Sequence, residues 1–181
     1  PPLTEDRAGP LSTRSTHPTT LWLASQVLQL LNIPVTITNP CEWITKGELV
    51  QAAAHACEKD VTEGIAQTLS CGKLDGRWYK GGNVNVNCGL CVSCVVRRAS
   101  IQAAGLRDDT KYLVDNLKGD PLRQLIRNRR GDIEAIKGAI VRGTDEDALI
   151  GCTGFPPGYD VSRGADVCRR ALEEVSRVQL P

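Results

Sequence analysis

Aromatic side chains are scarce in this chain of 181 residues. It contains three Trp, three Tyr and one Phe, and it has no Met. A hydrophobic core must therefore be built mainly from Leu, Ile, Val and Ala. Such a core is more typical of packed helices than of an aromatic-rich sheet, so we expect a mainly α-helical fold.

An excess of one charge and long apolar runs are also missing. The 22 Lys and Arg balance 21 Asp and Glu to a net charge of +1, which excludes a polybasic or acidic tail protein. The longest apolar stretch, residues 21–31, is interrupted by polar residues and is too short to span a bilayer. Residues 1–10 lack the apolar segment of a secretory signal. We therefore expect a soluble, cytoplasmic protein with no membrane partner.

The chain divides into three regions by composition. Residues 1–18 carry four prolines and are predicted to form an extended lead. Residues 19–112 hold the clearest helical patterns and the clustered cysteines, and residues 113–181 are predicted to form a helical C-terminal tail. Residues 97–142 contain 11 Lys and Arg against 6 Asp and Glu, so this portion carries +5 and the remainder −4.

Local signals predict the individual elements. Thr45 and Glu48 form the sequence pattern of a capping box, and apolar residues at helical spacing continue that helix to Cys57, which is expected on its buried side. The β-branched alternation at residues 35–38 predicts a short strand. Further helices are predicted over residues 19–31, 61–68, 94–104, 121–130, 131–141 and 160–178.

Four of the eight cysteines lie within 24 residues, as Cys71, Cys88, Cys91 and Cys94. Two residues between successive cysteines let the thiolates of one turn converge on a tetrahedral ion, and Cys71 returns as the fourth ligand after a long loop rich in Gly and Asn. A site whose four positions are all filled by protein is typical of structural zinc. The spacing therefore predicts a structural Zn²⁺ site.

Other interpretations of the cluster remain open at this point. An iron–sulfur cluster also takes four thiolates. A redox dithiol needs one pair only, within a thioredoxin-like βαβ pattern that the sequence lacks. Burial of all four as ordinary core residues is disfavoured because Gly89 and Ser93 between them do not form an apolar face.

The residues around the cysteines resemble the 7-cyano-7-deazaguanine synthase (QueC) family. Its zinc-binding C-terminal portion is similar to Ser70-Cys71, residues 88–99 with Arg97 and Arg98, residues 104–106, and residues 109–112. Asn39-Pro40 and residues 45–48 resemble the preceding segment of that family. Residues 14–18 and the long helical tail look more like divergent QueC-like proteins encoded in bacterial anti-phage defence systems.

The resemblance implies an ATP-dependent ligase of the PP-loop type. Such an enzyme adenylates a carboxylate on a 7-deazaguanine. Ammonia then displaces AMP to give an amide, a second activation gives the nitrile, and divergent members attach the base to other amines. This sequence departs from the pattern, because it lacks the Ser-Gly-Gly-x-Asp-Ser loop that cradles pyrophosphate. We expect it to be the C-terminal portion of an α/β PP-loop protein whose sheet domain is absent from this chain. It would then be inactive alone and depend on an N-terminal PP-loop domain or subunit for ATP and Mg²⁺.

Several residues are candidates for contacts outside the ligand set. Lys46 matches the family motif at a helix start and could bind a phosphate or carboxylate, or be a solvated lysine. Arg97 could contact substrate or, like Arg98, offset the charge of the zinc thiolates. His17, before Pro18, is predicted to be a turn residue rather than a base.

Two hypotheses of different classes follow. In the first, the chain is the zinc-bearing part of a ligase that acts on a 7-deazaguanine-type small molecule, with Trp78 and Tyr79 either stacking on the base or, as preferred, packing over the metal turn. The alternative is a free-standing zinc module that binds nucleic acid or a protein partner through its basic helices. Their basic face, otherwise expected to be solvated, comprises Arg123, Arg127, Arg129 and Arg130.

Overall fold

The structure is a computed structural model that describes residues 16–57 and 60–181. Within these residues every regular element is helical, and the one sheet-like pairing is an isolated parallel bridge between Asn87 and Tyr112. The prediction of a mainly α fold is confirmed. The lead proposed for residues 1–18 lies almost wholly outside the described residues.

The helices follow the predicted order, with two additions. The chain forms α1 Pro18–Leu30, α2 Lys46–Ala56, α3 Thr62–Ala66, the 3₁₀ turn η2 Gly76–Trp78, α4 Val92–Ala103, α5 Leu113–Asn116, α6 Gly119–Asn128, α7 Arg130–Arg142, α8 Glu146–Cys152 and α9 Val161–Ser176. The short helices α5 and α8 were not predicted. In the described part of the chain, no helix has the length and apolarity needed to cross a membrane.

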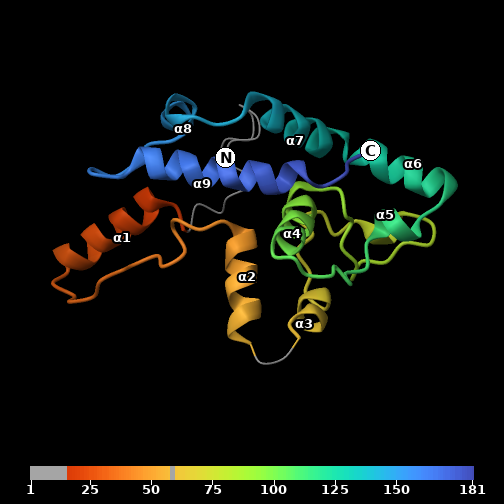
Figure 1. The fold of residues 1–181 in the computed structure, drawn as a ribbon, viewed down its shortest axis with the longest axis horizontal. Coiled ribbons are helices and arrows are strands. Elements are labelled where there is room, and N and C mark those ends of the chain that lie inside the picture. The colour runs from red at the N-terminus through yellow and green to blue at the C-terminus, as the bar shows by residue number, and fades with distance from the viewer. Residues whose placement is uncertain (1–15, 58–59) are drawn as a thin grey trace.

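Helix α9 organises the packing (Figure 1). Helices α2 and α4 pack on one side of it and α7 on the other. Aliphatic residues of α4, α7 and α9 form one hydrophobic core, which includes Val95, Ala99, Ile136, Leu172 and Val175. A second core surrounds the cysteines. Each large side chain buried there contributes about 1.5–3 kcal/mol, so the tail and the cysteine-bearing region stabilise each other.

Helix α2 begins as predicted. Thr45 accepts a hydrogen bond from the Glu48 amide (3.1 Å), and the Glu48 carboxylate accepts one from the Thr45 amide (2.8 Å). A Cβ on Gly47 would lie 2.7 Å from the Ala103 Cβ, so glycine is what allows α2 to approach α4 closely. The expectation that Cys57 is buried is wrong, because α2 ends just before it and its side chain is exposed.

The strand predicted at residues 35–38 is absent from the described structure. Residues 33–38 are irregular, and Val35 is 55% exposed. A strand needs a hydrogen-bonded neighbour, and α1 and α2, which flank this segment in the chain, offer no free strand edge. Residues 35–38 therefore have a strand-like sequence pattern but no neighbouring strand with which to form backbone hydrogen bonds.

Three of the seven aromatic residues stack with a histidine where the start of α1 meets the segment that precedes α9. His17 stacks on Phe155 (ring centroids 5.6 Å apart), Phe155 on Tyr159 (4.4 Å) and Tyr159 on Trp43 (5.3 Å). His17 is also the N-cap of α1, where its Nδ1 accepts a hydrogen bond from the Thr19 amide (3.2 Å). His17, predicted to be a turn residue, thus caps the start of a helix, and its lack of a role as a base stays a prediction.

Candidate metal centre

The four clustered cysteines meet at one buried point. The Sγ atoms of Cys71, Cys88, Cys91 and Cys94 lie within 4.8 Å of one another. The Cys71–Cys91 and Cys88–Cys94 sulfur pairs are 3.9 and 3.8 Å apart. A tetrahedral zinc ion with four sulfurs at about 2.3 Å requires sulfur–sulfur separations of about 3.8 Å. The buried cluster could therefore hold a metal ion such as zinc.

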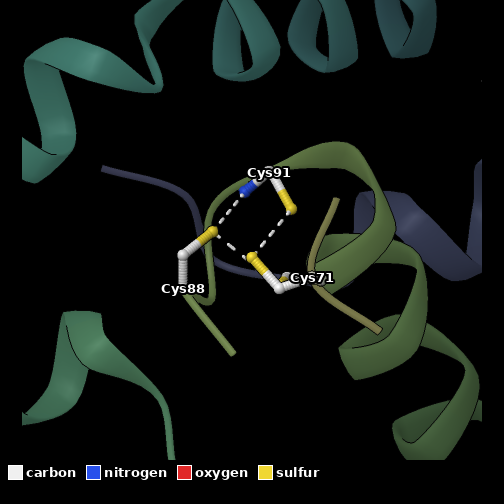
Figure 2. Close-up of side chains that lie close together, drawn as sticks. Cys71, Cys88 and Cys91 are labelled. Atoms are coloured by element: carbon white, nitrogen blue, oxygen red, sulfur yellow. Dashed lines mark hydrogen bonds between the residues drawn. The ribbon is translucent and has the colours of Figure 1, made fainter. Parts of the chain in front are cut away.

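The turn from Cys88 to Cys91 and the start of α4 together set the positions of three sulfurs. The Cys91 amide donates to the Cys88 Sγ (3.3 Å), and the two side chains point their sulfurs inward together with Cys71 (Figure 2). Gly89 has a φ of +86°, and a Cβ there would lie 2.7 Å from Val114 Cγ1, so the turn requires glycine. Cys91 is then the N-cap of α4 and Cys94 lies in its first turn.

A buried asparagine positions the fourth cysteine. The Asn87 Oδ1 accepts from the Ser70 amide (2.9 Å), and its Nδ2 donates to the Thr68 carbonyl (3.2 Å). These bonds hold the segment just before Cys71 beside the turn that starts at Cys88. The sequence analysis missed this role, because Asn87 ends a stretch whose composition indicated only a loop.

Arg129 is a buried cation in direct contact with one of the sulfurs. It is 2% exposed, its Nε donates to Cys88 Sγ (3.4 Å), and its guanidinium forms an ion pair with Asp75. Tyr79 donates to the same carboxylate (3.0 Å) and accepts from Asn128 (3.0 Å). A cluster of four thiolates around Zn²⁺ would carry a formal charge of −2, which a buried guanidinium offsets only in part.

The placement of Arg129 corrects the predicted basic face. The junction of α6 and α7 turns this side chain inward, so it does not lie on the solvated surface as expected. Arg123 and Arg130 are exposed and each pairs with a carboxylate of its own helix, Asp120 and Glu134 respectively. The free positive surface available to nucleic acid is accordingly smaller than the sequence indicates.

The thiols influence one another's ionisation. Hydrogen bonds from the other three cysteines lower the pKa of Cys71. For Cys88, the bond with Cys71 acts in the opposite direction, but bonds from Cys91, Cys94 and Arg129 still lower its pKa to about 6. The pKa values of Cys91 and Cys94 are raised by the same contacts with Cys71 and Cys88. The cluster thus stabilises part of the thiolate charge that a metal requires, and metal binding would release the remaining protons.

Arg97 and Arg98 occupy different surroundings. Arg97 is 5% exposed and donates to Thr68 Oγ1 (2.7 Å), Ser70 Oγ (3.0 Å) and Thr110 Oγ1 (3.2 Å). Its guanidinium thus holds the chain before Cys71 against the loop after α4, and it faces these hydroxyls rather than the sulfurs. Arg98 donates to the Gly89 carbonyl (3.4 Å) and lies over the Tyr112 ring (5.2 Å), so it supports the cysteine turn.

The other candidate residues lie apart from the cluster. Lys46 is exposed in the first turn of α2, where the Gly47 amide already donates to the Glu174 carboxylate (3.2 Å); its contact with a phosphate stays a prediction. Tyr79 is buried among the core residues around the cysteines, as the packing interpretation predicted. Trp78 does not pack in this way, since it is 69% exposed beside Arg77.

Comparison with known proteins gives two partial matches of the same kind. Over 79 residues the chain is 33% identical to a 7-cyano-7-deazaguanine synthase from Ralstonia pickettii, covering 44% of this chain and 30% of that protein. Over 81 residues it is 31% identical to a 7-cyano-7-deazaguanine synthase from Methanococcus maripaludis, covering 45% of this chain and 32% of that protein. No protein-family model and no solved structure matches the chain. The matched segment thus spans about a third of each relative, and over that part the chain is similar to 7-cyano-7-deazaguanine synthases.

Proposed function

We propose that this chain is the zinc-binding part of a QueC-like ATP-dependent ligase. The ligase would adenylate a 7-deazaguanine carboxylate and convert it to an amide or nitrile, or join it to another amine. The observation that carries the proposal is the buried four-sulfur site, with tetrahedral spacing, in a chain whose curated relatives are 7-cyano-7-deazaguanine synthases. A role in anti-phage defence stays a prediction from the sequence resemblance.

In this proposal zinc has a structural task. All four tetrahedral positions would be taken by Cys71, Cys88, Cys91 and Cys94, which leaves no position for a catalytic water. The metal would fix the start of α4 and, through Arg129, the junction of α6 and α7. ATP and Mg²⁺ would be bound by a PP-loop domain or subunit that acts together with this chain.

The surface of α1 and the segment after it supports such a partner. Residues 16–41 contain no Lys, Arg, Asp or Glu, although charged residues make up 24% of the chain. Leu23, Val27, Leu30, Leu31 and Val35 expose between 52% and 82% of their surface, and α1 lies at the edge of the molecule (Figure 1). An exposed, uncharged apolar surface is typical of an interaction site. We assign it to the nucleotide-binding part of the ligase, because the matched relatives are about three times as long as the matched segment.

The proposal is tested by reconstitution. The zinc-loaded chain is mixed with a polypeptide that carries the PP-loop half of a 7-cyano-7-deazaguanine synthase, with ATP, Mg²⁺ and 7-carboxy-7-deazaguanine, and AMP formation is measured. We expect AMP only when both polypeptides are present, and a loss of complex formation when Leu30 and Leu31 are changed to Lys. Arg123→Gln serves as the control, because Arg123 lies in α6 and is not part of this surface. A stable complex that forms no AMP with any 7-deazaguanine carboxylate would contradict the proposal.

A further inference from the structure

The loop between the second and first cysteine pairs of the metal centre, residues 72–87, exposes a tryptophan. Of the seven aromatic residues in the chain, Trp78 is the most exposed (69%), and Trp22 follows (38%). Trp78 ends the 3₁₀ turn η2, and the next residue, Tyr79, is buried in the core around the cysteines. The turn therefore directs one aromatic ring inward and leaves the large flat face of the other to a partner.

The backbone that carries Trp78 is held in place before any partner binds. The Trp78 amide donates to the Asp75 carbonyl (3.0 Å), and the Asp75 side chain is paired with Arg129. A Cβ on Gly76 would lie 2.0 Å from the Asn83 carbonyl oxygen, so the two arms of the loop touch. A ring presented by a fixed backbone loses little further freedom when it makes a contact.

Positive charge accompanies the exposed ring. The Arg77 guanidinium carbon lies 4.6 Å from the centroid of the Trp78 ring, and Lys80 is exposed two residues after Trp78. Among the described residues, neither Arg77 nor Lys80 forms an ion pair. The one acidic residue within 72–87 is Asp75, whose carboxylate is already bound to a buried guanidinium. The outer side of the loop thus combines an aromatic ring with uncompensated cations.

The last turn of α6 adds a third cation. The Asn128 side-chain amide donates to the Tyr79 hydroxyl (3.0 Å), so this end of α6 lies against the loop. Arg127, in the same turn, is exposed and has no ion pair in the part of the chain that the structure describes. Lys73 is different, because it pairs with Asp132 (3.6 Å). We call the remaining four residues the Trp78 surface: Arg77, Trp78, Lys80 and Arg127.

This combination suits single-stranded nucleic acid. Its unpaired bases stack on aromatic rings and on guanidinium planes, and its phosphates carry regularly spaced negative charge. A duplex keeps its base faces within its own stack, so it would meet the cations alone. An acidic peptide would also use the cations and would leave the ring without a planar partner. An exposed ring beside an arginine and two further cations therefore favours a single strand.

We propose that the Trp78 surface binds single-stranded nucleic acid. Trp78 stacks on a base, and Arg77, Lys80 and Arg127 contact phosphates. The site lies on the loop between the clustered cysteines and the end of α6, and only Arg127 belongs to the basic helix face that the sequence indicates. The inference goes beyond the proposed ligase function and does not depend on it.

Fluorescence anisotropy with the zinc-loaded chain tests the proposal. The probes are labelled oligo-U, oligo-dT and a DNA duplex of the same length. We expect one or both single strands to bind more tightly than the duplex, because only single strands offer free base faces. Three phosphate contacts give a slope of about −2 for the logarithm of the association constant against the logarithm of the salt concentration. A duplex bound as tightly as both single strands, or no binding at low salt, overturns the proposal.

Variants at exposed positions, which should not disturb folding, locate the binding. Trp78→Ala is expected to weaken the single strand by about fivefold to a hundredfold, and Trp78→Phe should recover part of this loss. Trp22→Ala, on α1, is the matched control and should leave the affinity unchanged. Equal affinities of the Trp78→Ala and Trp22→Ala proteins would contradict the assignment.

The salt dependence tests the cations separately from the ring. Lys80→Gln should make the slope shallower by about 0.7, the contribution of one phosphate contact to a single strand. Arg169→Gln, which removes an exposed arginine of α9 that is paired with Asp166, should leave the slope unchanged. The same slope in both variants would show that Lys80 contacts no phosphate and would overturn the proposed surface.

Competition with the free base separates this site from the ligase's own substrate site. An excess of 7-carboxy-7-deazaguanine should leave the oligonucleotide bound. Displacement of the oligonucleotide would assign Trp78 to the substrate of the ligase, so this inference would fail and the proposed function would stand. If the chain binds the single strand as expected but the reconstituted ligase forms no AMP, the proposed function fails and this inference stands.

Discussion

Replacement of Arg129 by Met tests whether the buried guanidinium supports the cysteine cluster. The side chain is 3% exposed, and that of its partner Asp75 is 26% exposed. Methionine keeps much of the aliphatic packing of the arginine stem but removes the ion pair and the N–H donor to Cys88 Sγ. It also leaves Asp75 and the sulfurs as uncompensated negative charge.

The expected loss is large because the pair is mostly buried. Removing one partner of a buried ion pair costs about 3–5 kcal/mol. Since Asp75 keeps some contact with water, we expect a value near the lower end, about 3 kcal/mol. Part of this loss should be seen in the metal site, because loss of a residue that supports a metal ligand weakens metal binding by about 10–100-fold.

The control is the neighbouring residue. Arg130→Met removes an ion pair with Glu134 whose two side chains are 77% and 59% exposed, and such pairs contribute about 0.2–1 kcal/mol. Urea unfolding of both zinc-loaded variants and competition with a chromophoric chelator give the two quantities. Unfolding free energies within about 0.5 kcal/mol of each other, together with equal zinc affinities, would refute the role assigned to Arg129.

Three further predictions concern packing, the α2–α9 contact and pH. Leu125 is fully buried beside the cysteines, and Leu125→Ala should lower the unfolding free energy measured in a urea titration by about 2–5 kcal/mol. Leu30 is 82% exposed, and Leu30→Ala should change the unfolding free energy by less than about 0.5 kcal/mol. Equal losses in the two variants would show that the core is misplaced. Glu174→Gln weakens the acceptor of the Thr45 hydroxyl and the Gly47 amide and should cost about 1–2 kcal/mol in thermal unfolding, more than the exposed Glu173→Gln. Burial acts to raise the pKa of Glu48, but the Arg170 guanidinium and the Thr45 amide lower it overall. Its contribution to stability is therefore present above the usual carboxyl pKa and is lost as the pH falls through the lowered value. Glu48→Gln should flatten that part of the stability–pH curve, and an unchanged acid limb would contradict the assignment.

Much of the fold is readable from local sequence signals. The capping box at Thr45 and the glycine after α4 mark two element ends correctly, because caps are decided by a few neighbouring residues. Gly105 adopts a φ of +71°, as its predicted place after α4 requires. The spacing of the cysteines likewise indicates the tetrahedral cluster, since three of the four sulfurs belong to one turn and the start of one helix.

The remaining features depend on contacts between distant segments. Arg129 lies 41 residues from Cys88, and its sequence neighbours suggest only a charged helix face. Residues 35–38 have the composition of a strand, but strand formation depends on a neighbouring strand. Asn87 organises the approach to Cys71 through hydrogen bonds to residues 17 and 19 positions away. Short-range patterns cannot reveal such partners.

The identity and ligands of the metal form the most direct test of the account. Metal analysis and X-ray absorption of the purified chain should find one zinc ion per chain with four sulfur ligands at about 2.3 Å. The Cys91→Ser protein should lose that zinc and, because metal-binding energy is folding energy in such sites, lose cooperative unfolding as well. Iron in place of zinc, no metal after anaerobic preparation, or a Cys91→Ser protein with unchanged zinc content and stability would contradict the account.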